Sequence, residues 1–81
     1  MKLTITFVEC CIVNDRGHYW FELETEQETS QCCYVRNGED WVYEEGDNEP
    51  DMPHELQVLF DEVGNEAFEE ALLNGKSELY L

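Results

Sequence analysis

The chain has 81 residues, and its 20 acidic and four basic side chains give a formal charge of −16 at pH 7. Hydrophobic residues make up 42% of it, which is too many for a disordered acidic tail and predicts one small domain over residues 1–81. No stretch has the roughly 18 apolar residues of a transmembrane helix, and the first residues lack the apolar segment of a signal peptide. We therefore expect a cytoplasmic protein whose charge repels membranes and nucleic acid.

Residues 3–13 and 19–24 predict a first pair of β-strands, because both segments are rich in β-branched and aromatic residues. The turn-forming residues 14–17 separate them. A loop of these four residues places Val13 opposite His18. The two segments therefore form a predicted hairpin.

The two faces of this hairpin differ in character. With this register, one face carries apolar side chains, which are Val8, Cys10, Ile12, Tyr19, Phe21 and Leu23. On the other face Cys11 lies opposite Trp20, and Glu9 lies opposite Glu22 as an unfavourable like-charge pair. The opposite parity holds at the start of the strand for Leu3, Ile5 and Phe7. This change of parity predicts a bulge near residues 7–9 or a strand covered on both faces.

The dipeptide Asn37-Gly38 predicts a second hairpin, because it lies between two β-rich segments and favours a turn with positive φ at both central positions. Pairing outward from this turn predicts Arg36 opposite Glu39, Tyr34 opposite Trp41, and Cys32 opposite Tyr43. The alternate face then carries Cys33, Val35 and Val42.

The second half of the chain predicts two short helices. Residues 44–53, rich in acids with Gly and Pro, form a loop. Helical spacing of apolar residues follows in 53–64 and again in 65–75, each segment ended by a glycine, with Asn65 as a candidate N-cap. Residues 76–81 form a last strand or an extended tail. This order predicts an α+β fold, an antiparallel sheet of four to five strands in two hairpins with two short helices packed on one face.

The four cysteines form two adjacent pairs, Cys10-Cys11 and Cys32-Cys33. Neighbours on a strand point to opposite faces, so neither pair has the spacing of a zinc site. We expect free thiols that pack as small hydrophobic residues. A cross-strand disulfide, or a metal or redox site built from both pairs, is the alternative.

Four glutamates alternate along the chain at Glu22, Glu24, Glu26 and Glu28. On an extended strand such residues share one face at about 6.6 Å spacing, and the resulting straight row is a plausible surrogate for the phosphates of a nucleic-acid strand. The alternative is a solvent-facing strand edge that discourages aggregation.

A second acidic cluster follows, with no Lys or Arg between Asn37 and Gly75. Its members are Glu39, Asp40, Glu44, Glu45, Asp47, Glu49 and Asp51. Trp41 and Tyr43 lie among them and are either core residues or anchors for a partner, since aromatic residues dominate many interfaces. The predicted partner-binding residues are this cluster, the two aromatic residues and the four glutamates of the row.

Enzymatic and metal-binding signatures are missing from the sequence. His18 and His54 have no nucleophile at a recognisable spacing, and an EF-hand beginning at Asp47 fails because Val58 occupies the position of the bidentate Glu. We expect a protein that is not an enzyme and has no catalytic residues, metal site or cofactor.

In size, composition and charge the whole chain resembles the small acidic inhibitors of phages and mobile elements, which include antirestriction proteins, anti-CRISPR proteins and uracil-DNA glycosylase inhibitors. The resemblance implies a nucleic-acid mimic, monomeric or homodimeric, that occupies the basic groove of a nucleic-acid-binding protein or nuclease complex, in the host cytoplasm if it is phage-encoded. An antitoxin, immunity or adaptor module that binds a basic protein through an aromatic and acidic sheet face is the alternative.

Overall fold

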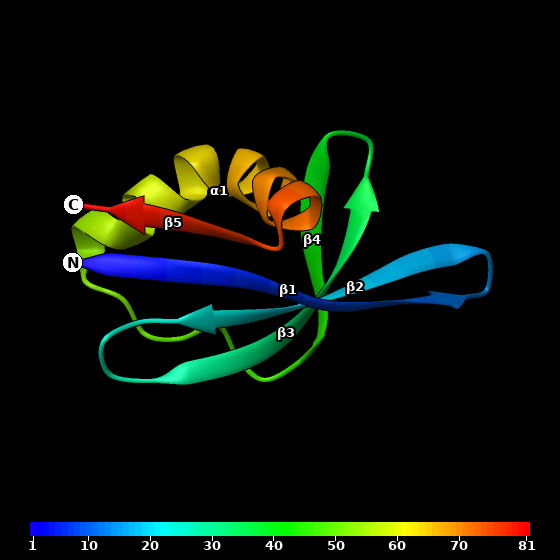
Figure 1. Ribbon diagram of the computed structural model, residues 1–81, viewed down its shortest axis with the longest axis horizontal. Coiled ribbons are helices and arrows are strands. Elements are labelled where there is room, and N and C mark those ends of the chain that lie inside the picture. The colour runs from blue at the N-terminus through cyan, green and yellow to red at the C-terminus, as the bar shows by residue number, and fades with distance from the viewer.

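A five-stranded antiparallel sheet is covered on one face by one helix in the computed structural model, which describes residues 1–81 (Figure 1). In chain order the elements are β1 (Lys2–Val13), β2 (Arg16–Glu24), β3 (Thr29–Asn37), β4 (Asp40–Gly46), α1 (His54–Asn74) and β5 (Lys76–Tyr80). The strand order is β4-β3-β2-β1-β5, so α1 connects the two edges of the sheet. The predicted α+β class and antiparallel sheet are confirmed.

The core lies between α1 and the sheet face that it covers. Phe68 of the helix is at its centre, with its ring centroid 4.3 Å from that of Tyr34 and 4.8 Å from that of Phe21. The buried cluster consists of Leu3, Ile5, Phe21, Leu23, Cys32, Tyr34, Trp41, Leu56, Phe60, Ala67, Phe68 and Ala71. The aromatic rings of this core meet edge-to-face or at a tilt, which are favourable arrangements for aromatic pairs.

One continuous helix replaces the two predicted short ones. Gly64 lies in its interior and is buried next to the ring of Phe60, so it is not a helix cap, and Asn65 is not an N-cap. A glycine inside a helix costs about 1 kcal/mol relative to alanine, which does not break a helix packed on both sides of that position. Gly75 ends the helix as predicted, with φ of 89° and its N–H bonded to the Ala71 carbonyl at 2.7 Å.

The β1–β2 turn is shorter than predicted. Asn14 and Asp15 alone form it, with φ of 51° and 64°, so Val13 pairs with Arg16 instead of His18. Asn and Asp tolerate the left-handed conformation that a tight hairpin of this kind requires. The predicted pairing of Glu9 with Glu22 is therefore wrong, because Glu9 lies opposite Trp20.

The predicted bulge in β1 is confirmed between Phe7 and Glu9. Val8 is the extra residue and is 45% exposed. The insertion restores a common face for the apolar residues before and after it, which resolves the conflict of parity in the sequence.

The second hairpin turns one residue later than predicted. Asn37 pairs with Asp40, and Gly38, with φ of 66°, is the first residue of the turn. A glycine at that position is typical of a type II′ turn. Tyr34 consequently pairs with Tyr43, and Arg36 with Trp41.

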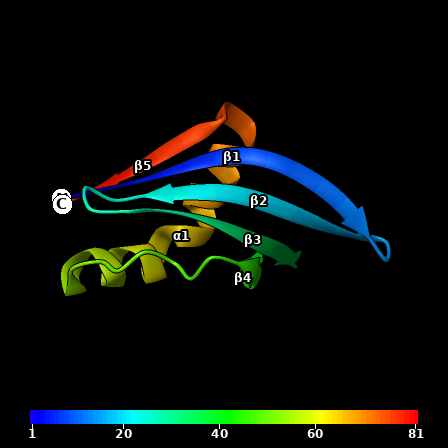
Figure 2. The same cartoon turned by 90° about the horizontal axis from the view of Figure 1, so that it is seen from below.

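Two peripheral features follow from this topology. The β1–β2 hairpin continues past the helix, and residues 12–17 at its end form a two-stranded arm, because the pairing of β2 with β3 stops at His18 (Figures 1 and 2). At the opposite end of the molecule the two termini meet, where the Leu81 N–H donates to the Met1 carbonyl at 2.9 Å. No helix combines the length and the apolar character needed to cross a bilayer.

Candidate acidic groove between the edge strand and the helix

The negative charge is concentrated in one part of the fold. Residues 37–75, which form β4, the following loop and α1, hold 13 of the 20 carboxylates and none of the four cations. The other seven carboxylates share the rest of the chain with all four cations. Residues 37–75, with 13 carboxylates and no cation, therefore carry −13 of the net charge of −16.

A groove between β4 and α1 collects part of this charge. Its larger section, the acidic hollow, has a volume of about 570 Å³ and contains no hydrophobic lining residue. The lining residues are Arg36, Gly38, Glu39, Asp40, Glu62, Asn65, Glu66 and Glu69. Five carboxylates thus surround one guanidinium group. They come from two elements far apart in sequence, the β3–β4 turn and the helix.

Helical spacing explains the wall that α1 contributes. Glu62, Glu66 and Glu69 follow one another at intervals of four and three residues, so they lie on one side of the helix. Asn65 lies between them and connects this wall to β4. Its Oδ1 accepts a hydrogen bond from the backbone N–H of Trp41 at 2.9 Å, and its Nδ2 donates to Asp40 at 3.1 Å.

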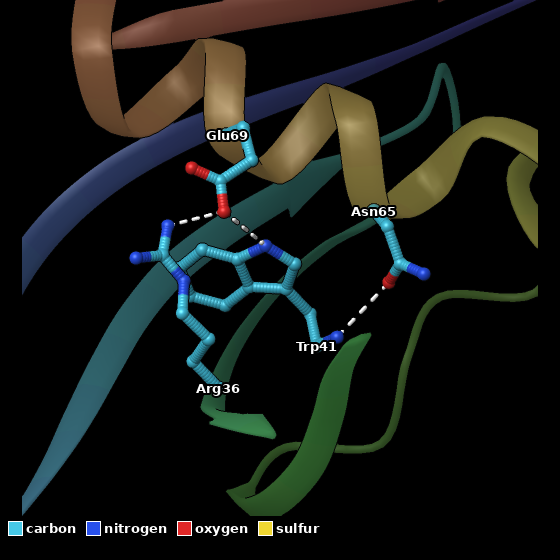
Figure 3. A network of polar contacts seen from close by, with 4 residues as sticks. All are labelled: Arg36, Trp41, Asn65 and Glu69. Atoms are coloured by element: carbon cyan, nitrogen blue, oxygen red, sulfur yellow. Dashed lines mark hydrogen bonds and ion pairs between the residues drawn. The ribbon is translucent and has the colours of Figure 1, made fainter. Parts of the chain in front are cut away.

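Arg36 lines the acidic hollow, and its guanidinium group lies beside Trp41 and Glu69 (Figure 3). Its guanidinium carbon lies 4.7 Å from the centroid of the Trp41 ring, and its Nη2 donates to Glu69. The same carboxylate oxygen of Glu69 accepts a second hydrogen bond from the indole Nε1 at 3.1 Å. The guanidinium is therefore stacked on an aromatic ring and neutralised by a carboxylate, which are the two interactions that bind arginine most strongly.

The smaller section of the groove, the aromatic hollow, adjoins the acidic one at Asn65 and has a volume of about 200 Å³. Its hydrophobic lining residues are Tyr34, Trp41, Tyr43, Phe60 and Phe68, and Glu49 and Asp61 also line it. The hydroxyl of Tyr34 donates to Glu49. Burial, and then this bond to a carboxylate, raise the pKa of Tyr34, so its hydroxyl remains a proton donor.

The predicted straight row of glutamates is wrong. β2 ends at Glu24, and a turn follows in which the Thr25 N–H donates to the Glu28 carbonyl at 2.9 Å. Glu22 and Glu24 therefore lie on a strand, whereas Glu26 and Glu28 belong to a turn. The Glu28 side chain also accepts a hydrogen bond from the Asp51 N–H at 2.6 Å. Glu28 therefore holds the loop that follows β4 in place.

The acids of the second predicted cluster are placed in two different ways. Glu39, Asp40, Glu44, Glu45 and Asp51 are exposed, on the turn, the edge strand and the loop. Asp47 and Glu49 instead hold the loop against the sheet. Asp47 Oδ2 accepts from the Gln31 N–H at 3.0 Å, and Glu49 accepts from Tyr34 as described above. These two carboxylates have structural partners within the chain.

The two predicted aromatic anchors also differ. Trp41 is 7% exposed and belongs to the core, so a partner has little access to its ring. Tyr43 is 41% exposed, and its hydroxyl donates to the carbonyls of Gly46 and Asp47 at 3.0 and 3.2 Å. Of the two, only Tyr43 offers an aromatic surface to a partner.

The cysteines lie in two environments. Cys10 and Cys11 are exposed on β1, whereas Cys32 and Cys33 are buried, and all four are free thiols. Burial, with a further contribution from nearby carboxylates, raises the pKa of Cys32 and of Cys33 to about 11. No three His, Cys, Asp or Glu side chains converge in a metal-binding arrangement.

Sequence reasoning missed the helical half of the acidic hollow. Glu62, Glu66 and Glu69 were within reach of a periodicity argument, because their spacing places them on one face of any helix that spans them. Asn65 was misassigned because the helix was expected to end at Gly64.

Comparison with known proteins finds no match: no protein family, no curated protein and no solved structure is significantly similar to the chain.

Proposed function

We propose that the chain is a binding protein, and not an enzyme, whose acidic hollow replaces a nucleic acid in the basic groove of a nucleic-acid-binding protein. The observation that carries this proposal is the placement of five carboxylates from two separate elements around one hollow. The folded backbone fixes their positions, so a partner does not have to order them on binding. The resemblance in size and charge to acidic inhibitors of phages and mobile elements points in the same direction.

The contacts of Arg36 indicate which partner side chains the hollow suits. One guanidinium already stacks on Trp41 and pairs with Glu69. The other carboxylates of the hollow have no cation from this chain, since the ion pairs of the molecule involve only Glu78, Glu45 and Glu69. Arginine and lysine are the residues with which proteins contact phosphates, so a protein built to bind nucleic acid supplies the missing cations.

Repulsion between carboxylates on α1 lowers the stability of the helix. Glu66 has Glu62 and Glu70 four residues away on either side, and a like-charge pair at this spacing destabilises a helix by about 0.2–0.5 kcal/mol. Solubility of a small domain requires a net charge of only roughly 2–8. The excess of charge therefore supports a role in binding.

The aromatic hollow favours a second candidate, an antitoxin, immunity or adaptor module that binds a basic protein without imitating nucleic acid. Tyr43 offers this module an exposed aromatic contact beside the acidic hollow. In this case a substitution of Tyr43 weakens binding more than the loss of carboxylates does, and binding depends little on salt.

Two variants that each lose four charges provide the test. The groove variant combines Glu39→Gln, Asp40→Asn, Glu62→Gln and Glu66→Gln. The control combines Glu22→Gln, Glu24→Gln, Glu26→Gln and Glu28→Gln. Both have the same net charge, and the amides retain the hydrogen-bond acceptors at Asp40 and Glu28.

The tagged proteins are used to capture partners from nuclease-treated lysate of a candidate host at about 50 mM and about 500 mM NaCl. We expect the wild type and the control to retain nucleic-acid-binding proteins at low salt, and heparin or high salt to release them. The groove variant should retain at most a tenth as much. Equal retention by both variants, or retention that heparin does not reverse, contradicts the proposal.

A further inference from the structure

The sheet face that α1 leaves uncovered, the open face, carries its apolar side chains in the half nearer the β1–β2 turn, the apolar half. Cross-strand pairing lines up Cys11, His18, Val35 and Val42 in one row across β1, β2, β3 and β4. The next row contains Glu9, Trp20, Cys33 and Glu45. Side chains of alternate residues share a face, so these two rows form one surface at the base of the arm.

Val13 and Val42 are 46% and 47% exposed on this surface, and Cys11 is exposed between them. Cys33 and Val35 are already buried by their neighbours. The remaining part of the open face is polar, with Thr4, Thr6, Glu22, Glu24 and Gln31.

The charges at the rim of the apolar half indicate what covers it. Arg16 lies beyond the first row, at the tip of the arm, and forms no ion pair, although carboxylates outnumber cations by 20 to four. An exposed arginine repels a basic partner and attracts an acidic one. Glu9 and Glu45 lie on the opposite side of the first row, so the occupant that fits has an apolar face with carboxylates opposite Arg16 and a cation opposite Glu9 and Glu45.

We propose that this face binds a second copy of the chain as a twofold-symmetric dimer, with the two sheets packed face to face. The twofold axis runs between the two sheets and along the row of Cys11, His18, Val35 and Val42. It therefore places the row on one side of this line in one copy over the row on the other side in the second copy. The row that contains Arg16 in one copy then lies over the row that contains Glu9 and Glu45 in the other copy. Arg16 of each copy then lies over Trp20 and beside Glu9 of the other copy, so this contact forms twice, and Val42 of one copy packs on Val42 of the other.

The area of the face sets the strength of the dimer. Four strands about 4.8 Å apart and three rows about 6.6 Å apart cover roughly 380 Å² in projection, whereas a stable interface buries about 800 Å² on each partner. The dimer is therefore weak and reversible. Repulsion between two chains of charge −16 opposes it, and salt screens this repulsion over distances beyond about 10 Å at 0.1 M.

The expected salt dependence is opposite to that of the proposed function. Binding of a basic protein weakens with salt, whereas the dimer tightens, so the two proposals stand or fall separately. We expect sedimentation equilibrium between about 10 µM and about 1 mM chain, in reducing buffer, to show association that is at least tenfold stronger at about 500 mM than at about 50 mM NaCl. The reducing agent excludes dimers linked through the exposed Cys10 and Cys11.

Two pairs of variants test the surface. Val42→Lys places a charge on the proposed interface, and Val58→Lys makes the same change at a similarly exposed valine, 40% exposed, on the helix. Arg16→Glu removes the proposed ion pairs, and Lys76→Glu makes the same change at the other cation without an ion pair. We expect association to weaken at least tenfold in the first member of each pair and to be nearly unchanged in the second.

Each alternative result overturns the proposal. A wild type that is monomeric at the highest concentration in both salts leaves the open face to a different protein. Association that survives Val42→Lys, or that Val58→Lys and Lys76→Glu weaken equally, places the contact elsewhere on the molecule. Circular dichroism of every variant verifies that the fold is retained.

Discussion

The side-chain oxygen of Asn65, in the middle of α1, accepts a hydrogen bond of 2.9 Å from the backbone N–H of Trp41 on the edge strand. This bond closes the outer edge of β4 at one point and holds the two walls of the groove together (Figure 3). An edge strand otherwise presents its N–H groups to solvent or to another chain.

We expect Asn65→Ala to lower the free energy of unfolding by about 1–3 kcal/mol, because the partly buried N–H of Trp41 loses its acceptor. Urea denaturation followed by tryptophan fluorescence measures the change. Asn48→Ala is the control, since Asn48 is an exposed loop residue, and should change stability by less than about 0.5 kcal/mol. Equal effects of the two substitutions contradict a structural role for Asn65.

Gly64→Ala should stabilise the protein by about 0.5–1 kcal/mol, because alanine favours a helix interior. An added Cβ would meet the nearest carbon atoms of Phe60 at 3.4 Å, which is ordinary contact. Gly75→Ala is the matched comparison at the helix end, where φ is 89°, and should destabilise by about 1 kcal/mol. Thermal unfolding of both variants gives the two signs, and a loss of stability in Gly64→Ala contradicts the packing described for the helix.

The continuous helix shows where sequence reasoning reached its limit. The buried positions Leu56, Phe60, Gly64, Ala67 and Ala71 keep one helical phase across the glycine, so the periodicity alone favoured one helix. The prediction instead followed the local rule that a glycine ends a helix, and it divided the helix at Gly64. The same rule gave the correct helix end at Gly75, because the helical spacing of buried residues also stops there.

The strands show a similar division between what was predictable and what was not. Alternation of side chains correctly predicted that Tyr19, Phe21 and Leu23 face the core and that β1 has a bulge near Phe7, because apolar burial determines which residues face the core. The prediction was wrong for Val8, Cys10 and Ile12, which were expected on the same apolar face and are exposed. The turns shifted both hairpin registers, since Asn14-Asp15 and Gly38-Glu39 adopt tight turns whose lengths depend on the pairing of whole strands. The turn at residues 25–28 was not predicted, so the strand was expected to continue through Glu26 and Glu28.

Gly46 is constrained by its neighbours more tightly than the other glycines. It has φ of 103°, and an added Cβ would lie 2.7 Å from the Gln31 carbonyl oxygen and 2.8 Å from the Trp20 ring. We expect Gly46→Ala to destabilise the protein by about 1–3 kcal/mol. Gly38→Ala has a positive φ but open space around the added carbon, so its cost should be smaller, about 1 kcal/mol. A urea titration in which Gly38→Ala is the more damaging change contradicts this assignment.

The buried thiols make stability depend on alkaline pH. In the folded chain the pKa of Cys32 and of Cys33 is raised to about 11, so the neutral thiol is favoured. The unfolded chain deprotonates at lower pH, and stability should therefore be complete below about pH 8.5 and decrease as the pH rises through about 11. Denaturation midpoints measured across this range give the slope, and the double variant Cys32→Ala, Cys33→Ala should reduce it.

The same burial predicts two classes of thiol reactivity. At pH 8 a disulfide reagent should modify the exposed Cys10 and Cys11 quickly and the buried pair only after unfolding, because the thiolate is the reactive form. Four thiols that react at one rate in the native protein contradict the burial of Cys32 and Cys33.

Glu66→Lys separates stability from binding in a single substitution. It replaces two like-charge contacts, with Glu62 and Glu70, by two attractive ones, so we expect the free energy of unfolding to rise by about 0.5–1 kcal/mol. The substitution also places a cation in the acidic hollow, so capture of nucleic-acid-binding proteins should decrease at least tenfold. Glu44→Lys, the same change on the exposed part of β4 outside the hollow, should leave both quantities nearly unchanged. A Glu66→Lys variant that gains stability and still binds as the wild type does would show that the hollow is not the binding site. The repulsion between Glu66 and its two neighbours would then lower stability without contributing to binding.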